Sequence, residues 1–418
     1  MKVSILAGAI AVVVFAGSGT VANSANRPLL SKSQASANLG ADPSYMALVE
    51  DRASAGIDLV QADASQVTET RESLQLAVGG EEIVASKQYT IRNPDGTMVW
   101  YGLLSPQANV YPRLRNWGTA EIADDPMNSV MIVRNGNKLT GTIRKEGQLY
   151  ALRPLRSGKH ALVRIDESRM PADHPNSYSL LPTIPMAPAV MASGAPTIQA
   201  ISTIRVMVVM TQSAINAVGD ASGLINLAVA ETNQGYANSG VDISLQLAGA
   251  YSTSYKESGS FSTDLSRFRG TSDGHMDSFH STRDSISADV GVLIINNSSS
   301  CGLASGIGST ASTAFAAVHH GCATGYYSFG HEIGHLQSAR HDPAADPSTT
   351  PYAYGHGYRY DSGGWRTIMA YACPSGCTRI NYWSNPAKTY GGAAMGTTST
   401  HHNQRVLNNT KATIAAFR

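Results

Sequence analysis

The sequence predicts an α/β (α+β) fold in two units. A small β-rich unit precedes a larger unit built on a mixed, twisted sheet and one helix rich in histidine. Short apolar runs between residues 83 and 165 are separated by turn signals, which is typical of antiparallel strands. Six prolines then fall within residues 170–200. After residue 201, apolar runs of strand length alternate with stretches of helical periodicity.

The overall composition suits two folded domains and argues against several functional classes. The chain has 418 residues, of which 42% are hydrophobic and 15% charged, so it can bury sizeable cores. Its formal net charge of +1 does not match the strongly basic surface that binds nucleic acid or an anionic membrane. We therefore expect no nucleic-acid partner and no stable membrane association.

Residues 1–25 are predicted to be a signal peptide. Lys2 supplies a short positive region, residues 3–16 form an apolar run, and small residues lead to cleavage after Ala22 or Ala25. The run is short for a membrane span, and a retained anchor is the alternative. The protein is expected to be secreted, with the periplasm as the other destination that such a signal serves.

Residues 26–169 are predicted to form the β-rich unit. Residues 26–80 are polar and rich in Ala and Ser, and weak helix is expected there. Strands separated by hairpin dipeptides are predicted at 87–92, 97–104, 129–134, 138–144, 148–153 and 160–165. Together they predict an antiparallel meander that has no catalytic cluster of its own.

Residues 201–418 are predicted to form the larger unit. Strands are expected at 203–210, 241–248, 290–295, 302–307 and 314–319, and helices at 224–236, 324–337 and 403–417. This alternation predicts a mostly parallel sheet with the strand at 302–307 as an open edge beside the next helix. An extended peptide could pair with that edge, so Gly302, Leu303 and Ala304 are predicted to bind substrate.

One predicted helix carries the residues that point most directly to chemistry. His331 and His335 are four residues apart, so they project from one face and can reach one metal ion. Glu332 can act as general base on a water at that metal. His341 would lie about 9 Å further along a continuous helix and point to another side. If His341 is a third ligand, the helix must end near Gln337 and the chain must turn back.

This motif resembles the zinc-binding pattern of the metzincin peptidases, H-E-x-x-H-x-x-G-x-x-H. The resemblance implies a metzincin-like catalytic domain with one catalytic Zn²⁺ on the three histidines and the neighbouring glutamate as base. Ser338 replaces the glycine of the pattern, where a tight turn favours positive φ. The resemblance also implies that Met369 forms the methionine turn beneath the zinc. Tyr371 would either bind the resting metal or stabilise the oxyanion.

One cation stands in the predicted wall of the substrate pocket, residues 372–386. Arg379 would attract an acidic side chain beyond the cleaved bond. The motif and residues 379–386 resemble reprolysin-like bacterial peptidyl-Asp metalloendopeptidases, which cut before Asp. This leads to the hypothesis that Arg379 reads Asp or Glu at P1′, the first residue after the cleaved bond. Asp342, which follows the third histidine, is expected to fix local structure.

Four cysteines, Cys301, Cys322, Cys373 and Cys377, all lie near the predicted metal site in the sequence. An even number in an exported protein predicts two disulfides. Three pairings are conceivable, and proximity in the chain favours Cys301–Cys322 and Cys373–Cys377. A metal clip formed by Cys373 and Cys377 is the alternative.

Residues 170–200 are predicted to be an exposed linker, where processing proteases cut. A β-rich unit and a cuttable linker ahead of a secreted hydrolase predict a zymogen, whose propeptide is an intramolecular inhibitor. A permanent accessory domain is the alternative. A carboxylate from Asp166-Glu167 or Asp173-His174 could take the open position of the zinc. No cysteine lies in this part of the chain, so a thiolate switch is excluded.

The sequence thus predicts a secreted zinc endopeptidase, made as a zymogen, that cuts proteins or peptides. A catalytically inactive zinc-containing binding or adhesin module is the first alternative, which the intact Glu332 disfavours. A zinc hydrolase directed at glycans or cell walls is the second. Neither a carbohydrate-binding repeat nor an aromatic platform in the sequence supports it.

Overall fold

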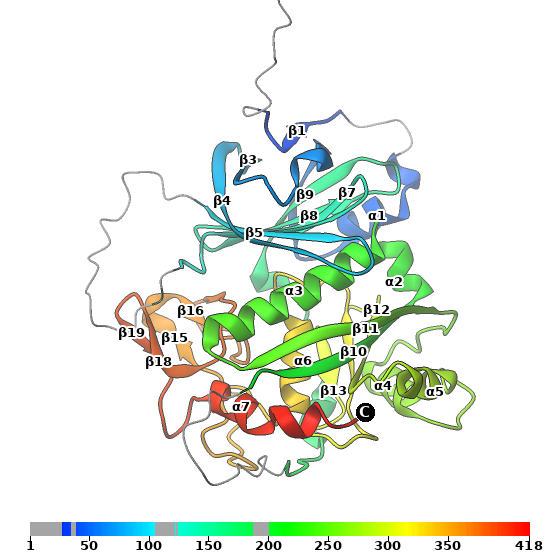
Figure 1. Cartoon of the computed structure of the whole chain (residues 1–418), viewed down its shortest axis with the longest axis vertical. Coiled ribbons are helices and arrows are strands. Elements are labelled where there is room, and N and C mark those ends of the chain that lie inside the picture. The colour runs from blue at the N-terminus through cyan, green and yellow to red at the C-terminus, as the bar shows by residue number, and fades with distance from the viewer. Residues whose placement is uncertain (1–26, 35–38, 105–121, 123, 187–199) are drawn as a thin grey trace, which may run out of the picture.

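The computed structural model of the chain describes residues 27–34, 39–104, 122, 124–186 and 200–418. The predicted signal peptide and the last part of the predicted linker lie outside these residues. None of the helices in the described ranges is long and apolar enough to cross a membrane. Two sheets lie one above the other in Figure 1, with a long helix between them.

The N-terminal unit is an antiparallel sheet of nine strands within the described residues, in the order β1-β2-β9-β8-β7-β6-β5-β4-β3. The strands are β1 (Leu30–Lys32), β2 (Ser54–Ala62), β3 (Ser73–Val78), β4 (Glu81–Arg92), β5 (Met98–Leu104), β6 (Ser129–Asn135), β7 (Lys138–Lys145), β8 (Gln148–Pro154) and β9 (His160–Ile165). All six predicted strands are confirmed. Consecutive strands pair from β3 to β9, because glycines at positive φ close several of their turns.

The expectation of weak helix over residues 26–80 is wrong for most of that stretch. Helix α1 (Pro43–Glu50) and the short 3-10 helices η2 (Leu39–Ala41) and η3 (Ala64–Gln66) do form. However, β2 and β3 lie there too. Leu74, Leu76 and Val78 are buried on alternate positions of β3, a period of two that favours a strand. Burial of this face in the N-terminal core outweighs the weak local preference.

The C-terminal unit holds a sheet of five strands in the fully described stretch 200–418, in the order β11-β10-β12-β14-β13. They are β10 (Ser202–Thr211), β11 (Ile243–Thr253), β12 (Val290–Ile295), β13 (Gly302–Ala304) and β14 (Phe315–His319). All pairs are parallel except β13 with β14. The prediction of a mixed, mostly parallel sheet with its edge at 302–307 is therefore confirmed, although the edge strand is shorter than expected.

Helices cover both faces of this sheet. One apolar core joins it to α2 (Gln212–Ala217), α3 (Ala221–Ser239), α6 (Ser328–Leu336) and α7 (Asn403–Ile414). A second core on the other face joins it to α4 (Phe261–Arg269) and α5 (Ser278–Ser285). Residues after α6 form small ladders, β15 (Arg359–Tyr360), β16 (Trp365–Arg366) and β17 (Thr378–Arg379), then β18 (Asn385–Tyr390) and β19 (Ala393–Met395), with the 3-10 helix η6 (Asp361–Gly363).

Helix α6 is shorter at its start than the sequence predicts. It begins at Ser328 rather than at residue 324, because Gly325 and Tyr327 have positive φ angles of 73° and 62°. A right-handed helix cannot include such residues. It ends at Leu336, which confirms that the helix stops beside Gln337.

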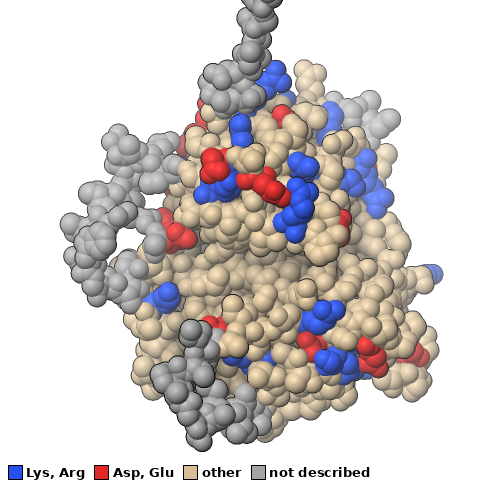
Figure 2. All heavy atoms as spheres, viewed as in Figure 1, with Lys and Arg blue, Asp and Glu red and all other residues tan. Residues whose placement is uncertain are grey.

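The two units meet across α3. Figure 1 shows this helix lying under the N-terminal sheet and over the C-terminal one. Leu227 and Ala230 of α3 share an apolar cluster with Val99, Met131 and Val133 of β5 and β6. Figure 2 shows charged side chains over the N-terminal sheet and near the lower end of the molecule, with few in the band between them. The N-terminal unit is therefore packed directly on the second unit.

The predicted linker is not free over its first half. After η4 (Glu167–Arg169), residues 170–186 run along the edge of the C-terminal sheet, with the 3-10 helix η5 (Asn176–Leu180) on the way. Ala172 pairs with Ser300 in a parallel bridge, and Thr183 pairs likewise with Ile307. Backbone hydrogen bonds therefore hold this segment on the second unit.

Glu231 supplies a test of the contact between the units. It is buried on α3, and its carboxylate accepts hydrogen bonds from the Thr142 hydroxyl at 2.5 Å and the Gly325 N–H at 2.7 Å. Burial raises its pKa from 4.5 to about 7, against the effect of these hydrogen bonds. The folded state thus holds this proton more tightly, so the stability it contributes is complete below pH 4.5 and lost as the pH rises through 7.

We expect the melting temperature of the full chain to fall between pH 5 and pH 8, with this group contributing about 2–3 kcal/mol to the change. Glu231→Gln, which cannot ionise, should flatten that dependence, as thermal unfolding at several pH values would reveal. Glu82→Gln, at an exposed position on β4, is the control. An unchanged slope in Glu231→Gln would contradict the assignment.

Candidate metal centre and active site

Three histidines of the motif converge on one point. Helix α6 presents His331 and His335 from one face, and the turn after the helix brings His341 back to them. Their Nε2 atoms lie 3.1, 3.1 and 3.0 Å apart. Tetrahedral ligands at the usual Zn–N distance of about 2.0–2.1 Å stand roughly 3.3 Å from one another. The spacing of the three nitrogens therefore fits a single bound metal ion.

Hydrogen bonds at the outer ring nitrogens determine which nitrogen faces inward. Nδ1 of His331 donates to the Ile368 carbonyl at 2.9 Å, and Nδ1 of His335 donates to the Ala339 carbonyl at 2.8 Å. With the proton on Nδ1, Nε2 carries a lone pair that points at the other rings. Burial lowers the pKa of His335 to about 4 and lowers those of His331 and His341 as well.

Neutral imidazoles whose lone pairs face one another at this distance repel unless a cation lies between them. His331 and His335 have no proton to place between their Nε2 atoms, because their ring protons are used at Nδ1. All-nitrogen ligands in a buried site suit zinc and its neighbours among the transition metals. These residues could therefore hold one divalent metal ion.

Ser338 makes the turn that the third histidine needs. Its φ angle is 75°, in the left-handed region that glycine adopts most easily. The surroundings hold this conformation. The Gly308 N–H donates to the His335 carbonyl at 2.7 Å, and the Ser309 hydroxyl donates to the Leu336 carbonyl at 2.8 Å. Ser338 thus takes a conformation typical of glycine because these two hydrogen bonds hold the end of α6 in place.

Glu332 lies beside the histidines and against the edge strand. A Cβ atom on Gly302 would approach its Oε1 to 2.2 Å, so only glycine fits at that position of β13. The Ala304 backbone donates a hydrogen bond to the carboxylate, while Leu303 packs into the core on the other face of the sheet. Burial raises the pKa of Glu332 to about 8, which suits a group that exchanges protons near neutral pH.

Met369 and the residues around it support the histidines from below. Its side chain is fully buried, and its sulfur lies close to α6 at Gly334. The preceding carbonyl, of Ile368, holds His331. The Asp342 carboxylate accepts a hydrogen bond from the Tyr371 N–H at 2.9 Å, so it ties the residue after the third histidine to this turn. That contact matches the structural role expected for Asp342.

A fourth histidine joins the cluster. The ring of His174 stands 5.1, 5.0 and 4.6 Å from the three motif rings, which stand 4.8, 5.2 and 4.6 Å from one another. Ligand atoms of all four lie within 4.8 Å of one another. Its Nε2 lies 3.1 Å from Oε1 of Glu332, and its Nδ1 lies 3.1 Å from the Tyr371 hydroxyl. Tyr371 itself contacts the ring of His341, at 4.4 Å between centroids.

The carboxylates expected to reach the metal from the N-terminal unit do not do so. Asp166 caps η4 through the Ser168 N–H. Glu167 forms a bidentate ion pair with Arg144, at 2.6 and 2.8 Å. Asp173 points to Arg379, so an imidazole rather than a carboxylate approaches the three histidines. A sequence offers no means of choosing among these neighbours, because the choice depends on which side chain the edge strand turns inward.

Two buried arginines form a pocket beside the cluster. Arg379 is fully buried, and its register partner on the neighbouring strand is Arg366. Like charges on paired residues repel, so this pair requires an anion or strong acceptors nearby. Both guanidiniums donate to the Ala370 carbonyl, and both lie over the ring of Tyr326. Oδ2 of Asp173 lies 2.9 Å from Arg379 Nη2 and 3.8 Å from Arg366 Nη1.

Arg366 and Tyr326 escaped the sequence analysis. Neither belongs to a motif, and they precede Arg379 by 13 and 53 residues respectively. The parallel pairing of β16 with β17, two residues each, is too short to leave a periodic signal. Arg379 itself is fully buried, so it is not an ordinary surface arginine.

Both predicted disulfides are present, Cys301–Cys322 and Cys373–Cys377, which confirms that pairing and excludes a metal clip. The first links the start of β13 to the loop ahead of α6. The second closes the loop between Tyr371 and Arg379. Each disulfide thus braces a wall of the site.

Comparison with known proteins identifies the relatives of the chain. It is 54% identical to a "Peptidyl-Asp metalloendopeptidase" of Xanthomonas campestris pv. campestris, over 94% of this chain and 92% of that protein. The chain belongs to the peptidyl-Asp metalloendopeptidase family. A protein of the same name from Stenotrophomonas maltophilia is 56% identical over 91% of this chain and 90% of its own length. The profile of metallo-peptidase family M12, Reprolysin_5, matches residues 201–384.

Membership in this family confirms the resemblance found in the sequence. The chain is a metalloendopeptidase. The profile runs from the first strand of the C-terminal sheet, β10, to just beyond β17, which carries Arg379. The metal-binding cluster therefore lies within the matched residues, apart from His174, which precedes them.

Replacement of Ser338 tests the turn. A left-handed conformation costs a non-glycine residue about 1–2 kcal/mol, partly offset by the greater freedom of glycine in the unfolded chain. We expect Ser338→Gly to keep its metal content and to melt at the same temperature or a few degrees higher. Ser338→Val should lose about 2 kcal/mol or more, because branching at Cβ conflicts with positive φ.

Thermal unfolding and metal analysis of the two variants would check this. Ser298→Gly, at an exposed serine without positive φ, is the control and should gain no stability. If Ser338→Gly lowers the melting temperature as much as valine does, the serine side chain itself is needed.

Proposed function

We propose that this protein is a secreted zinc-dependent endopeptidase that hydrolyses the peptide bond on the amino side of an acidic residue. The observation that carries the proposal is the convergence of three buried Nε2 atoms with a carboxylate, Glu332, beside them. The relatives named above, which are called peptidyl-Asp metalloendopeptidases, support the same reaction.

Zinc is the ion that we assign to His331, His335 and His341. Three neutral imidazoles on a tetrahedral ion leave one position open, the ligand set of many hydrolytic zinc sites. When bound, the ion supplies positive charge that polarises the scissile carbonyl and makes water at the open position more acidic. The hydrogen bonds at Nδ1 keep two of the rings oriented for this task.

Glu332 is assigned as general base and then general acid. It accepts the proton of the attacking water and passes it to the nitrogen of the departing amine, so one carboxylate serves both halves of the reaction. Its buried position against Gly302 restricts its movement. Gly302, Leu303 and Ala304 of β13 supply the edge on which an extended peptide can lie. The Tyr371 hydroxyl, beside the metal ligands, is assigned to the developing oxyanion.

The arginine pocket is assigned to the P1′ side chain. A carboxylate between Arg379 and Arg366 forms charge-assisted hydrogen bonds in a site that excludes water. A neutral side chain there would leave two buried charges without an anion, which is a large penalty. Specificity thus arises as much from rejecting neutral residues as from attracting acidic ones.

Export of the protein is part of the proposal. Residues 1–25 are assigned as the signal peptide, 26–169 as the propeptide, 170–200 as the linker and processing region, and 201–418 as the protease domain. Two disulfides support an oxidising destination, either outside the cell or the periplasm. The carboxylate of Glu332 beside the histidine cluster argues against an inactive adhesin. The relatives named above argue against a glycan hydrolase.

Glu332→Gln tests the catalytic step. This substitution keeps the shape of the side chain and removes its basicity, so kcat on a peptide substrate should fall by about 10²–10⁴-fold. Zinc content, measured by elemental analysis, should remain near one ion per chain. Glu69→Gln, an exposed position in the N-terminal unit, is the control. Full activity of Glu332→Gln would exclude the proposed base, and another metal in the active protein would exclude zinc.

Arg379→Leu tests specificity. In the full chain activated by limited proteolysis, kcat/KM would be compared for peptides that differ only in Asp, Asn or Leu at P1′. We expect the preference for Asp over Asn to fall by about 10–100-fold in Arg379→Leu, while Arg379→Lys keeps part of it. An unaltered preference would rule out Arg379 as the reader of the acidic residue.

A further inference from the structure

The segment Pro171–Ala172–Asp173–His174 lies in the site that a substrate would use. The Cys301 N–H donates to the Ala172 carbonyl at 2.8 Å, and the Gly302 N–H donates to the Asp173 carbonyl at 3.1 Å. These bonds extend the parallel bridge between Ala172 and Ser300. The segment therefore occupies the edge beside β13 by backbone pairing.

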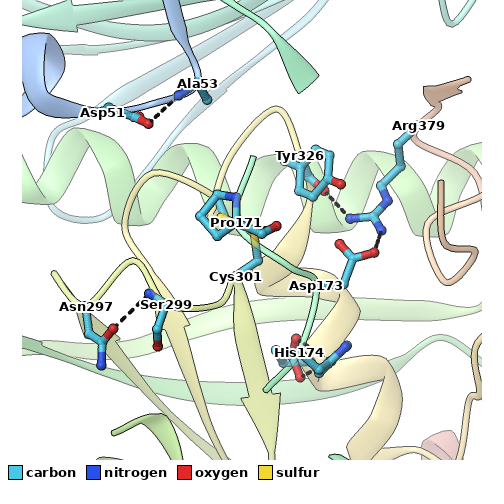
Figure 3. Close-up of a disulfide and its surroundings, with 12 residues drawn as sticks. Asp51, Ala53, Pro171, Asp173, His174, Asn297, Ser299, Cys301, Tyr326 and Arg379 are labelled. Atoms are coloured by element: carbon cyan, nitrogen blue, oxygen red, sulfur yellow. Dashed lines mark hydrogen bonds and ion pairs between the residues drawn. A yellow bond between two sulfur atoms is a disulfide. The ribbon is translucent and has the colours of Figure 1, made fainter. Parts of the chain in front are cut away.

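Asp173 fills the arginine pocket. Figure 3 shows its carboxylate pointing to Arg379, whose guanidinium also reaches Tyr326. Burial would raise the pKa of Asp173, but the charges of Arg379 and Arg366 hold it below the ordinary value, so the group is ionised. One carboxylate thus pairs with both arginines, as the P1′ side chain of a substrate would.

His174 fills the remaining side of the metal cluster. Its ring is as far from each motif histidine as those rings are from one another, so four imidazoles surround one point nearly evenly. In Figure 3 it lies below the Asp173–Arg379 pair, further along the segment. Consecutive residues of an extended segment point to opposite faces, which is why one dipeptide can reach both places.

We propose that Asp173-His174 is a two-point latch. Asp173 occupies the acid-binding pocket in place of the P1′ side chain, and His174 completes the ligand set of the metal in place of water. The latch rests on the proposed function, because it uses the same pocket and the same metal. It makes the precursor inactive by competing directly with acidic substrates.

The latch carries the preferred acidic residue and yet presents no carbonyl for hydrolysis. The carbonyls of Ala172 and Asp173 accept hydrogen bonds from the backbone at residues 301 and 302. The position next to the metal is taken by a side-chain nitrogen. Nε2 of His174 lies 3.1 Å from Glu332, the proposed base, where the attacking water would otherwise be held. The inhibitor is therefore bound through specificity contacts but not cut.

Tyr178 closes the latch on its C-terminal side. Its ring lies 4.4 Å from that of His341 and 5.3 Å from that of His335. Its hydroxyl donates to Asp346 at 2.9 Å, and Asp346 is paired with Arg340 at 2.7 Å. The latch is thus held at both ends by the protease domain, so it acts at a high effective concentration as long as the chain is intact.

Binding experiments on the precursor test the latch without relying on catalysis. The full chain carrying Glu332→Gln, which should not process itself, would be loaded with Co²⁺ in place of zinc. Three further variants are made in this background: Asp173→Asn, His174→Ala and the control Asp166→Asn. Asp166→Asn removes the same charge from a carboxylate that caps η4, ahead of the segment and outside the metal cluster.

The first measurement is the affinity for a fluorescent peptide with Asp at its centre, by anisotropy. The latched protein should bind weakly, and Asp173→Asn and His174→Ala should each bind at least about tenfold more tightly. Asp166→Asn should match the latched protein. Equal affinity in all four proteins would overturn the latch.

The second measurement is the visible absorption of the bound Co²⁺, which reports its ligands. His174→Ala should change the spectrum and let azide change it further, whereas the latched protein should be insensitive to azide. An identical, azide-insensitive spectrum in His174→Ala would exclude His174 as a ligand. Asp173→Glu, which keeps the carboxylate, serves as a second variant. If the carboxylate of residue 173 occupies the arginine pocket, Asp173→Glu should bind the fluorescent peptide more weakly than Asp173→Asn does.

The outcomes separate the latch from the proposed function. If the opened variants bind Asp and Asn peptides equally, the proposed preference of the pocket for acidic residues is wrong. Ligation of the metal by His174 is then still tested separately by the Co²⁺ spectrum. If the opened variants bind the Asp peptide tightly but the processed protein with intact Glu332 does not cleave it, the proposed reaction is wrong and the latch is supported.

Discussion

The convergence of three imidazole nitrogens on one point governs the rest of this structure. Two of them come from one face of α6, and their four-residue spacing within one helix is enough to bring them together. The third requires that α6 end at Leu336 and that Ser338 take a left-handed conformation. The Gly308 N–H and the Ser309 hydroxyl donate to the carbonyls that the helix end leaves unpaired, so the unfavourable turn is stabilised by its surroundings.

Elements far apart in the chain are arranged around this point. The turn at Met369 lies beneath it and orients His331 through the Ile368 carbonyl. The edge strand β13 lies beside it and leaves space for Glu332 only because residue 302 is glycine. Two disulfides brace the loops that carry these parts. A metallopeptidase site is thus built from short segments that the sheet and α6 hold in register.

The segment that follows the N-terminal sheet also reaches the three histidines, through His174. The sheet packs on α3 through an apolar cluster, and the segment after β9 crosses to the edge strand. Buried charges lie along this route, including the pairs Arg144–Glu167 and Arg379–Asp173. Such pairs are weak sources of stability but strong sources of specificity, because a misplaced segment would leave a charge buried without its partner.

The sequence by itself determined the secondary structure of most of the chain and the core of the site. Alternating apolar residues and turn glycines predicted six N-terminal strands, and the spacing of His331, His335 and His341 predicted both the ligands and the end of α6. These signals are local, since a repeat of 2 or 3.6 residues can be seen within one segment. The same local view missed β3, whose alternation is masked by polar neighbours.

Tertiary structure alone decided which distant side chains complete the site. Arg366 lies beside Arg379 because two two-residue strands happen to pair, and His174 rather than a neighbouring carboxylate faces the three histidines. Neither choice leaves a pattern in the chain, because each depends on how a non-periodic segment is oriented when it docks on an edge. The sequence therefore predicted the histidine and glutamate residues of the site. The packing of separate segments determined which residues form the arginine pocket and which residue occupies it.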